Sequence, residues 1–461
     1  MARKFTIVFV ALSFISLTSC MVGPDYKKPE LPIKKKWQTA SMRESPGRIV
    51  QMDWWKEFGD PQLNYLIETA IDESYDLKIL FDKLAAAGAL TKKSQADLYP
   101  SADMTAMGEF TKSENAGAAK ELDIRAGVTW ELDLWGKKRR EIAAKQAEQQ
   151  SLEAEYRAGY LKLVSEVGTN YFLVRQLDLQ AEMAKGHLED NTAILKIYQQ
   201  QHTEGLVAEE KVDRQRAEVF DLKRDIEEMR RRRKIAENHI TTLLGKPVGA
   251  MAVPYDGKSE IVRPVDIPVG LPSNLLERRP DIIAAEFLVL KAVNLEGAAE
   301  AAKLPSFSLT AKGGLIGVAF SSLLSGGIVG ITPQLMLPIF DAGKRQAEVE
   351  MRKAEVRIAS SRYAKVVLNA FEEVENALVN LNSRQKQYEY LGKRIRSLRK
   401  VRKQTFQKLE MGLVSQLEVL EVEKELYSAE KAMPLLKRYL LDDSITLYKA
   451  LGGGWPPINV Q

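Results

Sequence analysis

The chain contains one structural plan twice, and this duplication constrains its fold more than any other feature. Short segments pair at a fixed offset of 207 residues: Gly136-Lys137 with Gly343-Lys344, and Gly205-Leu206-Val207 with Gly412-Leu413-Val414. A register kept over such a distance indicates an internal repeat, in which each copy forms one supersecondary unit. Each half is predicted to contain a helix, two strands, a long helix, a tight turn and a returning helix.

The long helix is the dominant element of each predicted half. No proline occurs from Lys137 to Glu204, and the segment is rich in residues of high helix propensity. At about 1.5 Å per residue, this helix is roughly 100 Å long. Glycine just past a helix commonly ends it, so Gly205 marks the predicted end. Helices of this length favour coiled-coil packing over a compact globule.

The second half repeats this pattern, with helices predicted from Lys344 to Met411 and from Val414 to Leu451. Pro434 lies inside the second of these helices. It predicts a kink or a discontinuity, because proline cannot donate the helical hydrogen bond. Asp60-Pro61 predicts a capped helix start, and Pro280 predicts a new helix after a short turn.

The repeat divides the chain into six predicted segments. They are a signal peptide (residues 1–19), an extended N-terminal arm (20–59), repeat 1 (60–245), an equatorial linker (246–272), repeat 2 (273–452) and a C-terminal tail (453–461). The predicted strands cover about residues 100–111, 122–134, 305–316 and 328–340, and the tip turns cover 205–207 and 412–414. The predicted fold class is therefore mainly α with a small β part.

The four predicted strands alternate between apolar and polar residues. In the second strand, Ile124 and Val128 alternate with Asp123 and Arg125, which is the period of two typical of a strand. Pro333 interrupts the fourth strand and weakens that prediction. Such alternation suits a transmembrane barrel with lipid outside and water inside. A half-buried sheet that lies in water is the alternative.

A membrane-spanning sheet would require several copies of the chain. The mature sequence has no apolar stretch of about 18 residues or more, so a spanning helix is excluded. Membrane barrels need about eight strands or more, so four strands cannot close. Three chains would give twelve strands, and four chains would give sixteen. The long helices of three chains would then form an α-helical barrel continuous with the strands.

The N-terminus has the pattern of an export signal. Arg3 and Lys4 precede an apolar run from Phe5 to Leu17, which is too short to span a bilayer. Cys20 is the only cysteine, and with Leu17 it fits the bacterial lipobox Leu-x-x-Cys. We predict that the mature chain begins at Cys20, with N-palmitoyl and S-diacylglycerol groups that anchor it stably. The alternative is an ordinary signal peptide with an incidental cysteine.

No motif in the sequence predicts an enzyme, a metal site or a cofactor site. The spacing of the three histidines fits neither a helical ligand pair nor a zinc signature. These histidines are His187, His202 and His239. They are expected to be solvated or packed helical side chains.

The charge pattern gives no reason to expect nucleic-acid binding. The net charge of +5 is small for 461 residues, and the basic run of residues 230–234 follows Glu227 and Glu228. This arrangement predicts a solvated helix face with ion pairs at i,i+4 spacing. The predicted pairs are Glu227–Arg231 and Glu228–Arg232.

Several motifs together resemble one known family. They are Gly23-Pro24-Asp25-Tyr26 after the cysteine, Trp54-Trp55 with Phe58, Leu276 to Ile282, Pro338 to Arg345, and Gly412 to Ser415. Over nearly its whole length the chain resembles the TolC-like outer membrane efflux proteins, and more closely their lipoprotein branch, typified by OprM. The resemblance implies a homotrimer with a twelve-stranded β-barrel, a long α-helical barrel and an equatorial collar.

The resemblance also implies a function, a passive exit duct in the outer membrane of a Gram-negative bacterium with its helical barrel in the periplasm. Such a duct exports drugs or other toxic compounds. Its implied partners are a periplasmic adaptor and an inner-membrane transporter of the resistance–nodulation–division (RND) type. Alternatives are a duct for type I protein secretion, and a lipid-anchored periplasmic scaffold without a pore.

By the same resemblance, Glu418 and Glu421 match positions where relatives place aspartates around the closed periplasmic entrance. Three copies would place six carboxylates around one axis. Such a ring attracts cations, and its carboxylates repel one another. These two glutamates are therefore the predicted gate and selectivity ring.

The resemblance assigns the two tip turns to adaptor docking. The predicted docking residues are Gly205, Leu206 and Val207 in repeat 1, and Gly412, Leu413, Val414 and Ser415 in repeat 2. One departure concerns the lock near the tip, where TolC has a tyrosine and an arginine. Leu409 and Val414 stand at those places, so closure is expected to depend more on apolar packing.

Overall fold

The computed structural model describes residues 21–29, 31, 37–38, 52–113, 117–255, 275–317 and 327–454. The predicted signal peptide, Cys20, linker residues 256–272 and tail residues 455–461 lie outside this described part. The described part is mostly helical, with one four-stranded antiparallel sheet. None of its helices combines the length and the apolar character needed to cross a membrane.

The two halves of the chain have nearly the same order of elements. The first half contains η2 (Trp54–Phe58), α2 (Pro61–Glu73), α3 (Tyr75–Ala96), β1 (Ser101–Ser113), β2 (Gly117–Leu132), α4 (Lys137–Thr203) and α5 (Glu209–Leu243). The second half contains α6 (Leu275–Arg278), α7 (Pro280–Ala301), β3 (Ser306–Gly317), β4 (Gly327–Met336), α8 (Lys344–Glu410) and α9 (Gln416–Ala450). α4 and α8 have 67 residues each, and α5 and α9 have 35 each. The repeat in the sequence is therefore a repeat in the structure.

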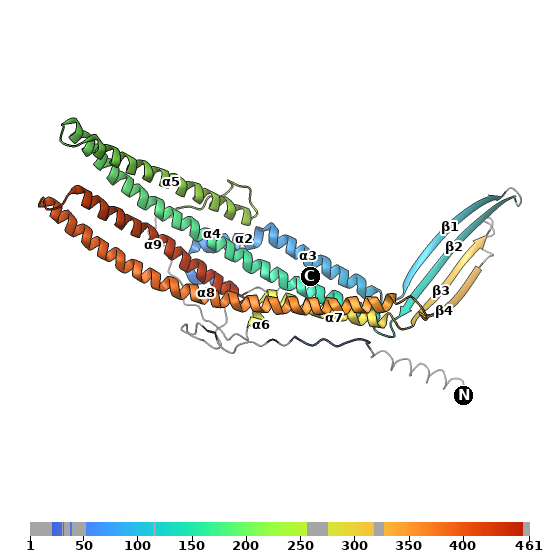
Figure 1. Cartoon of the computed structure of the whole chain (residues 1–461). Coiled ribbons are helices and arrows are strands. Elements are labelled where there is room, and N and C mark those ends of the chain that lie inside the picture. Colours follow the sequence, from blue (N-terminus) through green and yellow to red (C-terminus); the bar gives the residue numbers. More distant parts are fainter. Residues whose placement is uncertain are drawn as a thin grey trace.

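The molecule is elongated (Figure 1). The sheet lies at one end, and the two turns that join α4 to α5 and α8 to α9 lie at the other. α4 and α5 form one antiparallel hairpin, and α8 and α9 form the second hairpin beside it. At about 1.5 Å per residue, α4 and α8 are each roughly 100 Å long. These two hairpins carry the tips far from the sheet.

Local sequence signals set the helix ends. The Asp60 carboxylate accepts hydrogen bonds from two backbone N–H groups of the first turn of α2, at 3.0 and 3.2 Å, which confirms the predicted cap. Pro280 begins α7, also as predicted. Gly205 and Gly412 follow α4 and α8 with φ values of 72° and 71°. Glycine adopts this left-handed conformation without strain, so both helices end there.

The predicted discontinuity at Pro434 does not occur. α9 continues without a break from Gln416 to Ala450, and Pro434 is buried inside it. Proline leaves the carbonyl of Glu430 without its helical donor. However, the Gln180 side chain of α4 donates to the Lys431 carbonyl at 2.8 Å. α9 therefore packs against α4 next to the proline and stays continuous across it.

Two strands differ from their predicted bounds, because pairing rather than alternation sets their ends. β2 begins at Gly117, earlier than predicted, since it pairs with β1 as far as Ser113. β2 also ends two residues early, at Leu132. β4 ends at Met336, opposite the first residue of β3, so residues 337–340 do not extend the sheet. Pro333 is accommodated in β4, which is an edge strand of the single-chain sheet.

The main hydrophobic core lies midway along the molecule, where the two hairpins meet η2 and α2 (Figure 1). Trp54 stacks on Tyr448 of α9 with the ring centroids 4.6 Å apart. Phe58 packs edge-on against Phe172 of α4 at 5.4 Å. The segment that precedes α2 therefore joins repeat 1 to the last helix of repeat 2.

Candidate functional site

The two tip turns have the same backbone geometry. After α4, the Leu206 N–H donates to the Gln201 carbonyl at 2.8 Å, and after α8 the Leu413 N–H donates to the Lys408 carbonyl at 2.9 Å. Leu206 and Leu413 are each 69% exposed. Both turns lie at the end of the molecule opposite the sheet (Figure 1). The structure thus places the predicted docking residues together at one end, each turn presenting an apolar side chain.

The two turns differ in how the following helix begins. α5 starts after Ala208, whose side chain cannot cap it. α9 starts after Ser415 in a capping box, in which Glu418 accepts from the Ser415 N–H at 3.3 Å. The Glu418 carboxylate, predicted for the gate, is therefore turned toward its own helix start. The lock positions Leu409 and Val414 are half-buried apolar residues.

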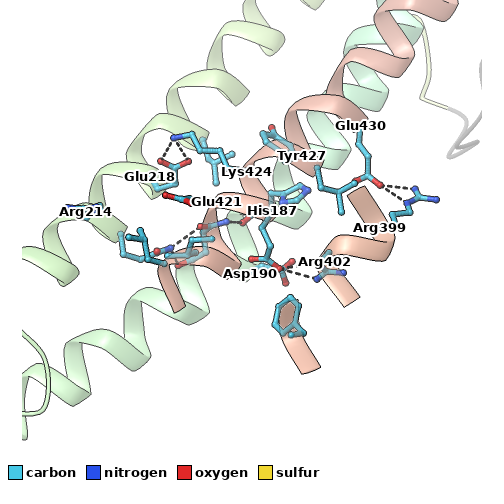
Figure 2. Close-up of a pocket in the computed structure, with 18 of the residues that line it drawn as sticks. His187, Asp190, Arg214, Glu218, Arg399, Arg402, Glu421, Lys424, Tyr427 and Glu430 are labelled. Carbon is cyan, nitrogen blue, oxygen red and sulfur yellow. Dashed lines mark hydrogen bonds and ion pairs between the residues drawn. The ribbon is translucent and has the colours of Figure 1, made fainter. Parts of the chain in front are cut away.

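A cavity of about 920 Å³ lies between the two hairpins near the tips (Figure 2). All four long helices contribute charged side chains to it. Among these are Asp190 on α4, Glu218 on α5, Arg399 on α8, and Glu421 and Glu430 on α9. Of the two predicted gate glutamates, only Glu421 lines this cavity. The structure gives the two glutamates different surroundings, although they are one helical turn apart.

Ion pairs hold α8 to α9 along this cavity. The Arg402 guanidinium lies 3.1 Å from Glu423, and the Arg399 guanidinium lies 2.7 Å from Glu430. Figure 2 labels Arg399, Glu430 and Arg402 and marks the Arg399–Glu430 pair with dashed lines. The second hairpin is therefore cross-linked within itself by charges on facing helices.

Two lysines of α9 connect the second hairpin to the first. The Lys424 ammonium lies 3.3 Å from Glu218, and the Lys431 ammonium lies 2.6 Å from Asp225, both on α5. The Lys431 hydrogen bond lowers the pKa of Asp225. The local sequence pattern does not predict these links. Each link joins residues 206 positions apart, one short of the repeat offset of 207, so opposite charges close to that offset were the available signal.

His187 packs against Tyr427 across the same space, with the ring centroids 4.1 Å apart. Burial lowers the pKa of His187, which favours the neutral imidazole, and burial raises the pKa of Tyr427 to about 12. His202 lies elsewhere, with Nδ1 3.0 Å from the Val207 carbonyl at the tip. Across the described residues, no group of three or more potential ligands is placed to hold a metal ion.

The basic run on α5 forms ion pairs, but with different partners from those predicted. Arg230 pairs with Glu227, and Arg231 pairs with Glu228 at 2.7 Å, so the spacing is i,i+3 rather than i,i+4. Residues three apart are also neighbours on a helix surface. Arg233 turns inward instead and lies 2.5 Å from Asp178 of α4. The run therefore combines a solvated helix face with one structural contact to α4.

The sheet at the other end leaves apolar side chains uncovered. Val329 is 89% exposed and Ile331 is 71% exposed, on the same face of β4. The opposite face carries polar and charged side chains, such as Arg125 and Thr332, which are also exposed. A water-exposed apolar face of this kind marks a surface that another medium or another chain covers.

The comparisons with known proteins agree with this architecture. The pattern of the outer membrane efflux proteins matches residues 66–246 and 271–453, which are the two repeats. The probable efflux pump outer membrane protein TtgC of Pseudomonas putida is 29% identical over 475 residues, covering 98% of this chain and 96% of that protein. The cation efflux system protein CusC of Escherichia coli is 28% identical over 447 residues, covering 96% and 97%.

The solved open-state structure of the MtrE outer membrane channel of Neisseria gonorrhoeae is similar to this chain. It superposes with a TM-score of 0.84 and 26% sequence identity, covering 94% of this chain and 98% of that one. Because the family pattern spans both repeats and the relatives are matched over nearly their whole length, the resemblance found in the sequence is confirmed. The chain belongs to the outer membrane efflux protein family, a family of channels rather than enzymes, and it is an outer membrane exit duct.

Proposed function

We propose that three copies of this chain form the exit duct of a tripartite efflux system. Their twelve strands close one barrel in the outer membrane, and their long helices form a continuous tube in the periplasm. An inner-membrane RND-type transporter supplies the energy, and a periplasmic adaptor connects it to the duct. The chain itself is a passive conduit for drugs or other toxic compounds and performs no catalysis.

The observation that carries this proposal is the sheet with two uncovered faces. Four strands cannot close a barrel alone. Unpaired strand edges and uncovered apolar side chains are both costly in water. Three copies pair every edge, place the apolar face of Val329 and Ile331 against lipid, and give the polar face a water-filled bore.

Neighbouring residues of β4 test this assignment, because their side chains lie on opposite faces. Ile331→Lys places a charge on the lipid face, at an expected cost of about 2–4 kcal/mol near the bilayer midplane. Thr332→Lys places the same charge in the bore and is the matched control. We expect the first variant to lower the amount of trimer in the outer membrane, and the second to leave it unchanged. Equal trimer yields in the two variants would contradict the proposed membrane orientation.

The lipid anchor at Cys20 is part of this proposal. The first described residues lie against the junction between strands and helices, where the Val22 N–H donates to the Trp135 carbonyl at 3.1 Å. Cys20 stands two residues before this contact. N-palmitoyl and S-diacylglycerol groups there would enter the membrane beside the sheet. Cys20→Ser is expected to abolish palmitate labelling, and labelling that persists would contradict the assignment.

We propose that the tips dock the adaptor. The exposed Leu206 and Leu413 support this, because both turns offer apolar contact area at the far end of the duct. Gly412→Trp is expected to abolish efflux without loss of the trimer. Gly412→Asn is the matched control, since asparagine tolerates the left-handed backbone of this turn. Normal drug resistance in cells with Gly412→Trp would count against docking at this turn.

We also propose that Glu418 and Glu421 form the selectivity ring. The capping box makes alanine a poor test, because Glu418→Ala would also remove a helix cap. Glutamine at residue 418 can keep the cap and removes the charge. The double variant Glu418→Gln, Glu421→Gln is therefore expected to keep the trimer and to weaken cation block in planar bilayers. Unchanged block would refute the ring.

A further inference from the structure

The two repeats of one chain meet along a boundary that runs from the sheet into the helices. β2 of repeat 1 pairs with β3 of repeat 2, and α4 packs against α7. The Ser151 hydroxyl of α4 donates to the Ala284 carbonyl of α7 at 3.1 Å, and Glu148 lies 2.8 Å from Lys291. The outer strands β1 and β4 each have only one neighbouring strand in the described sheet. Each repeat therefore has one edge that the other repeat covers and one edge that the chain leaves open.

Equivalent positions in the two repeats are related by two fixed offsets. α3 and α7 have 22 residues each and start 205 positions apart, and α4 and α8 have 67 residues each and start 207 positions apart. The strands obey the same offsets. Ser101 pairs with Thr129 in the first hairpin, and their counterparts Ser306 and Met336 pair in the second. Each residue of these elements of repeat 1 therefore has a defined counterpart in repeat 2.

A stripe of α4 that is packed inside the chain has an open counterpart on α8. Ala144 and Ser151 lie seven residues apart on one face of α4, and both are buried. Their counterparts, 207 positions later, are Met351 and Ile358. Met351 is exposed, and Ile358 is 51% exposed. Large apolar side chains of α8 thus lie in water where α4 is covered.

α3 has an open face that matches this stripe. The counterpart of Ala284, which contacts Ser151, is Ile79 of α3, and Ile79 is 53% exposed. Ala86 and Leu90 continue the same apolar stripe and are also exposed. Two residues that touch inside the chain therefore have two exposed isoleucines, Ile79 and Ile358, as their counterparts.

The strands show the same open edge. Trp130 and Leu132 extend β2 beyond the first residue of β1 and pair only with β3. Their counterparts, Leu337 and Ile339, directly follow the end of β4. Both side chains are exposed, Ile339 by 91%. In the single chain, β4 lacks the neighbour that would continue it through these residues.

We propose that the boundary between the repeats inside one chain is reproduced between chains. β4 and α8 of one copy fit β1 and α3 of the next copy, so that Ile358 packs against the partner's Ile79 and β4 lengthens to Ile339. The inference rests on the proposed trimer, whose three chains supply six repeats. A head-to-tail contact of this kind closes into a ring when its rotation fits, here a ring of six similar units.

The repeat also sets the register of the new strand pair. Thr129 of β2 lies opposite Thr310 of β3. Moving each residue to its counterpart in the other repeat places Met336 opposite the partner's Thr105. A slip of one residue would turn the apolar side chains of one strand toward the polar face of its neighbour. The register therefore keeps both faces of the barrel continuous from chain to chain.

The ion pair at the boundary is not kept between chains. The counterparts of Glu148 and Lys291 are Glu355 and the partner's Ala86, which cannot form an ion pair. Glu355 instead pairs with Arg352 on its own helix at 2.9 Å. The contact between the helices of two chains therefore depends on burial of apolar side chains.

A pair of cysteines in the full-length chain tests the register. Met336→Cys combined with Thr105→Cys places two thiols opposite each other on neighbouring chains. Within one chain, three strand spacings of about 4.8 Å separate β1 from β4. A disulfide needs Cα atoms within about 7 Å, so it cannot form inside the chain. Oxidation with copper phenanthroline in outer membranes is expected to give covalent trimers and no larger species.

The matched control is Met336→Cys with Ser101→Cys, which lies on the same face but four residues out of register. Its cross-linked yield is expected to be lower by at least about tenfold. Each single variant measures the background, including any reaction of Cys20. Trimers that the control pair links, or trimers on native gels that the test pair fails to link, overturn the register and leave the exit duct intact.

A charge placed on α8 tests the helical part of the contact. Ile358→Lys is expected to cause loss of the trimer on native gels, because it places an unpaired charge in the contact. Adding Ile79→Glu should restore the trimer, since the two charges would then face each other. Both side chains are exposed in the single chain, so neither variant should unfold it.

The outcomes separate this inference from the proposed function. A trimer that persists in Ile358→Lys, or a loss that Ile79→Glu does not reverse, overturns the contact between α8 and the partner's α3. A chain with the native residues that runs as a monomer in detergent and stays uncross-linked in the membrane overturns the trimeric exit duct as well.

Discussion

At the scale of single residues, a polar cluster near the end of α9 shows how burial changes the pKa of a carboxyl group. Arg438 donates to the Asp442 carboxylate and, at 2.7 Å, to the Gln176 side chain of α4. Arg384 of α8 lies 2.5 Å from Asp443. Burial, opposed by Arg438 and reinforced by Asp443, raises the pKa of Asp442 to about 6. The folded state therefore holds a proton on Asp442 more tightly than the unfolded chain does.

This raised pKa predicts how stability changes with pH. A carboxyl group whose pKa is higher in the folded state contributes most stability below its unfolded pKa, near 4. That contribution is lost as the pH rises through about 6. Asp442→Asn is therefore expected to raise the free energy of unfolding by about 1–3 kcal/mol at pH 7.5, and to change it little at pH 4. Guanidinium unfolding at both pH values measures this, and an equal effect at both would contradict the raised pKa.

At the scale of elements, the two returning helices share their length but differ in how they begin. α5 and α9 have equal lengths and follow turns of equal geometry. However, only α9 begins with a capping box, formed by Ser415 and Glu418. The corresponding residues of the first half are Ala208 and Lys211, 207 positions earlier. The two turns therefore have the same backbone geometry, but the helices that follow them are capped differently and should differ in local stability.

The capping box predicts a stability difference between the tips. Ser415→Ala removes the cap and should cost about 1 kcal/mol in the first turn of α9. Amide hydrogen exchange of residues 416–419 is expected to become faster, while exchange at the start of α5 stays the same. Ala208→Ser is the reciprocal variant and should slow exchange at the start of α5. Unchanged exchange in both variants would show that the caps do not control the tips.

At the scale of the whole molecule, the N-terminal arm crosses both repeats beside the sheet. The Arg140 guanidinium of α4 donates to the Val22 and Gly23 carbonyls at 3.3 and 3.4 Å. It also donates to Asn294 of α7 at 3.2 Å. A Cβ atom placed on Gly23 would lie 2.4 Å from the Gly297 Cα. The arm therefore docks where two glycines allow its backbone to touch α7.

This crossing predicts that a side chain at residue 297 releases the arm. A Cβ atom there would lie 2.9 Å from the Arg140 Nε and 3.2 Å from the Val22 carbonyl. Gly297→Val is expected to speed tryptic cleavage after Lys27 in the full-length protein by about tenfold. Gly186→Val is the matched control, since nothing lies within 4 Å of a Cβ on that helical glycine. Unchanged cleavage in Gly297→Val would mean that this contact does not hold the arm.

The sequence by itself determined the features that depend on near neighbours along the chain. Helix propensity and the absence of proline gave the lengths of α4 and α8, and glycine gave their ends at Gly205 and Gly412. The alternation of apolar and polar residues predicted the four strands and which side chains share a face of the sheet. The same local signals predicted the cap at Asp60. These features depend on bonds within a few residues, so the local pattern is sufficient.

Only the tertiary structure decided the features that join distant parts of the chain. α9 continues through Pro434 while Gln180 of α4 binds it at Lys431, and pairing with β1 and β3 sets where β2 begins and where β4 ends. The Lys424–Glu218 link joins residues 206 positions apart, and Arg125 lies over a glycine from the other repeat. The physical reason is that these contacts depend on how two hairpins and four strands approach one another in space. No local window of the sequence contains both partners.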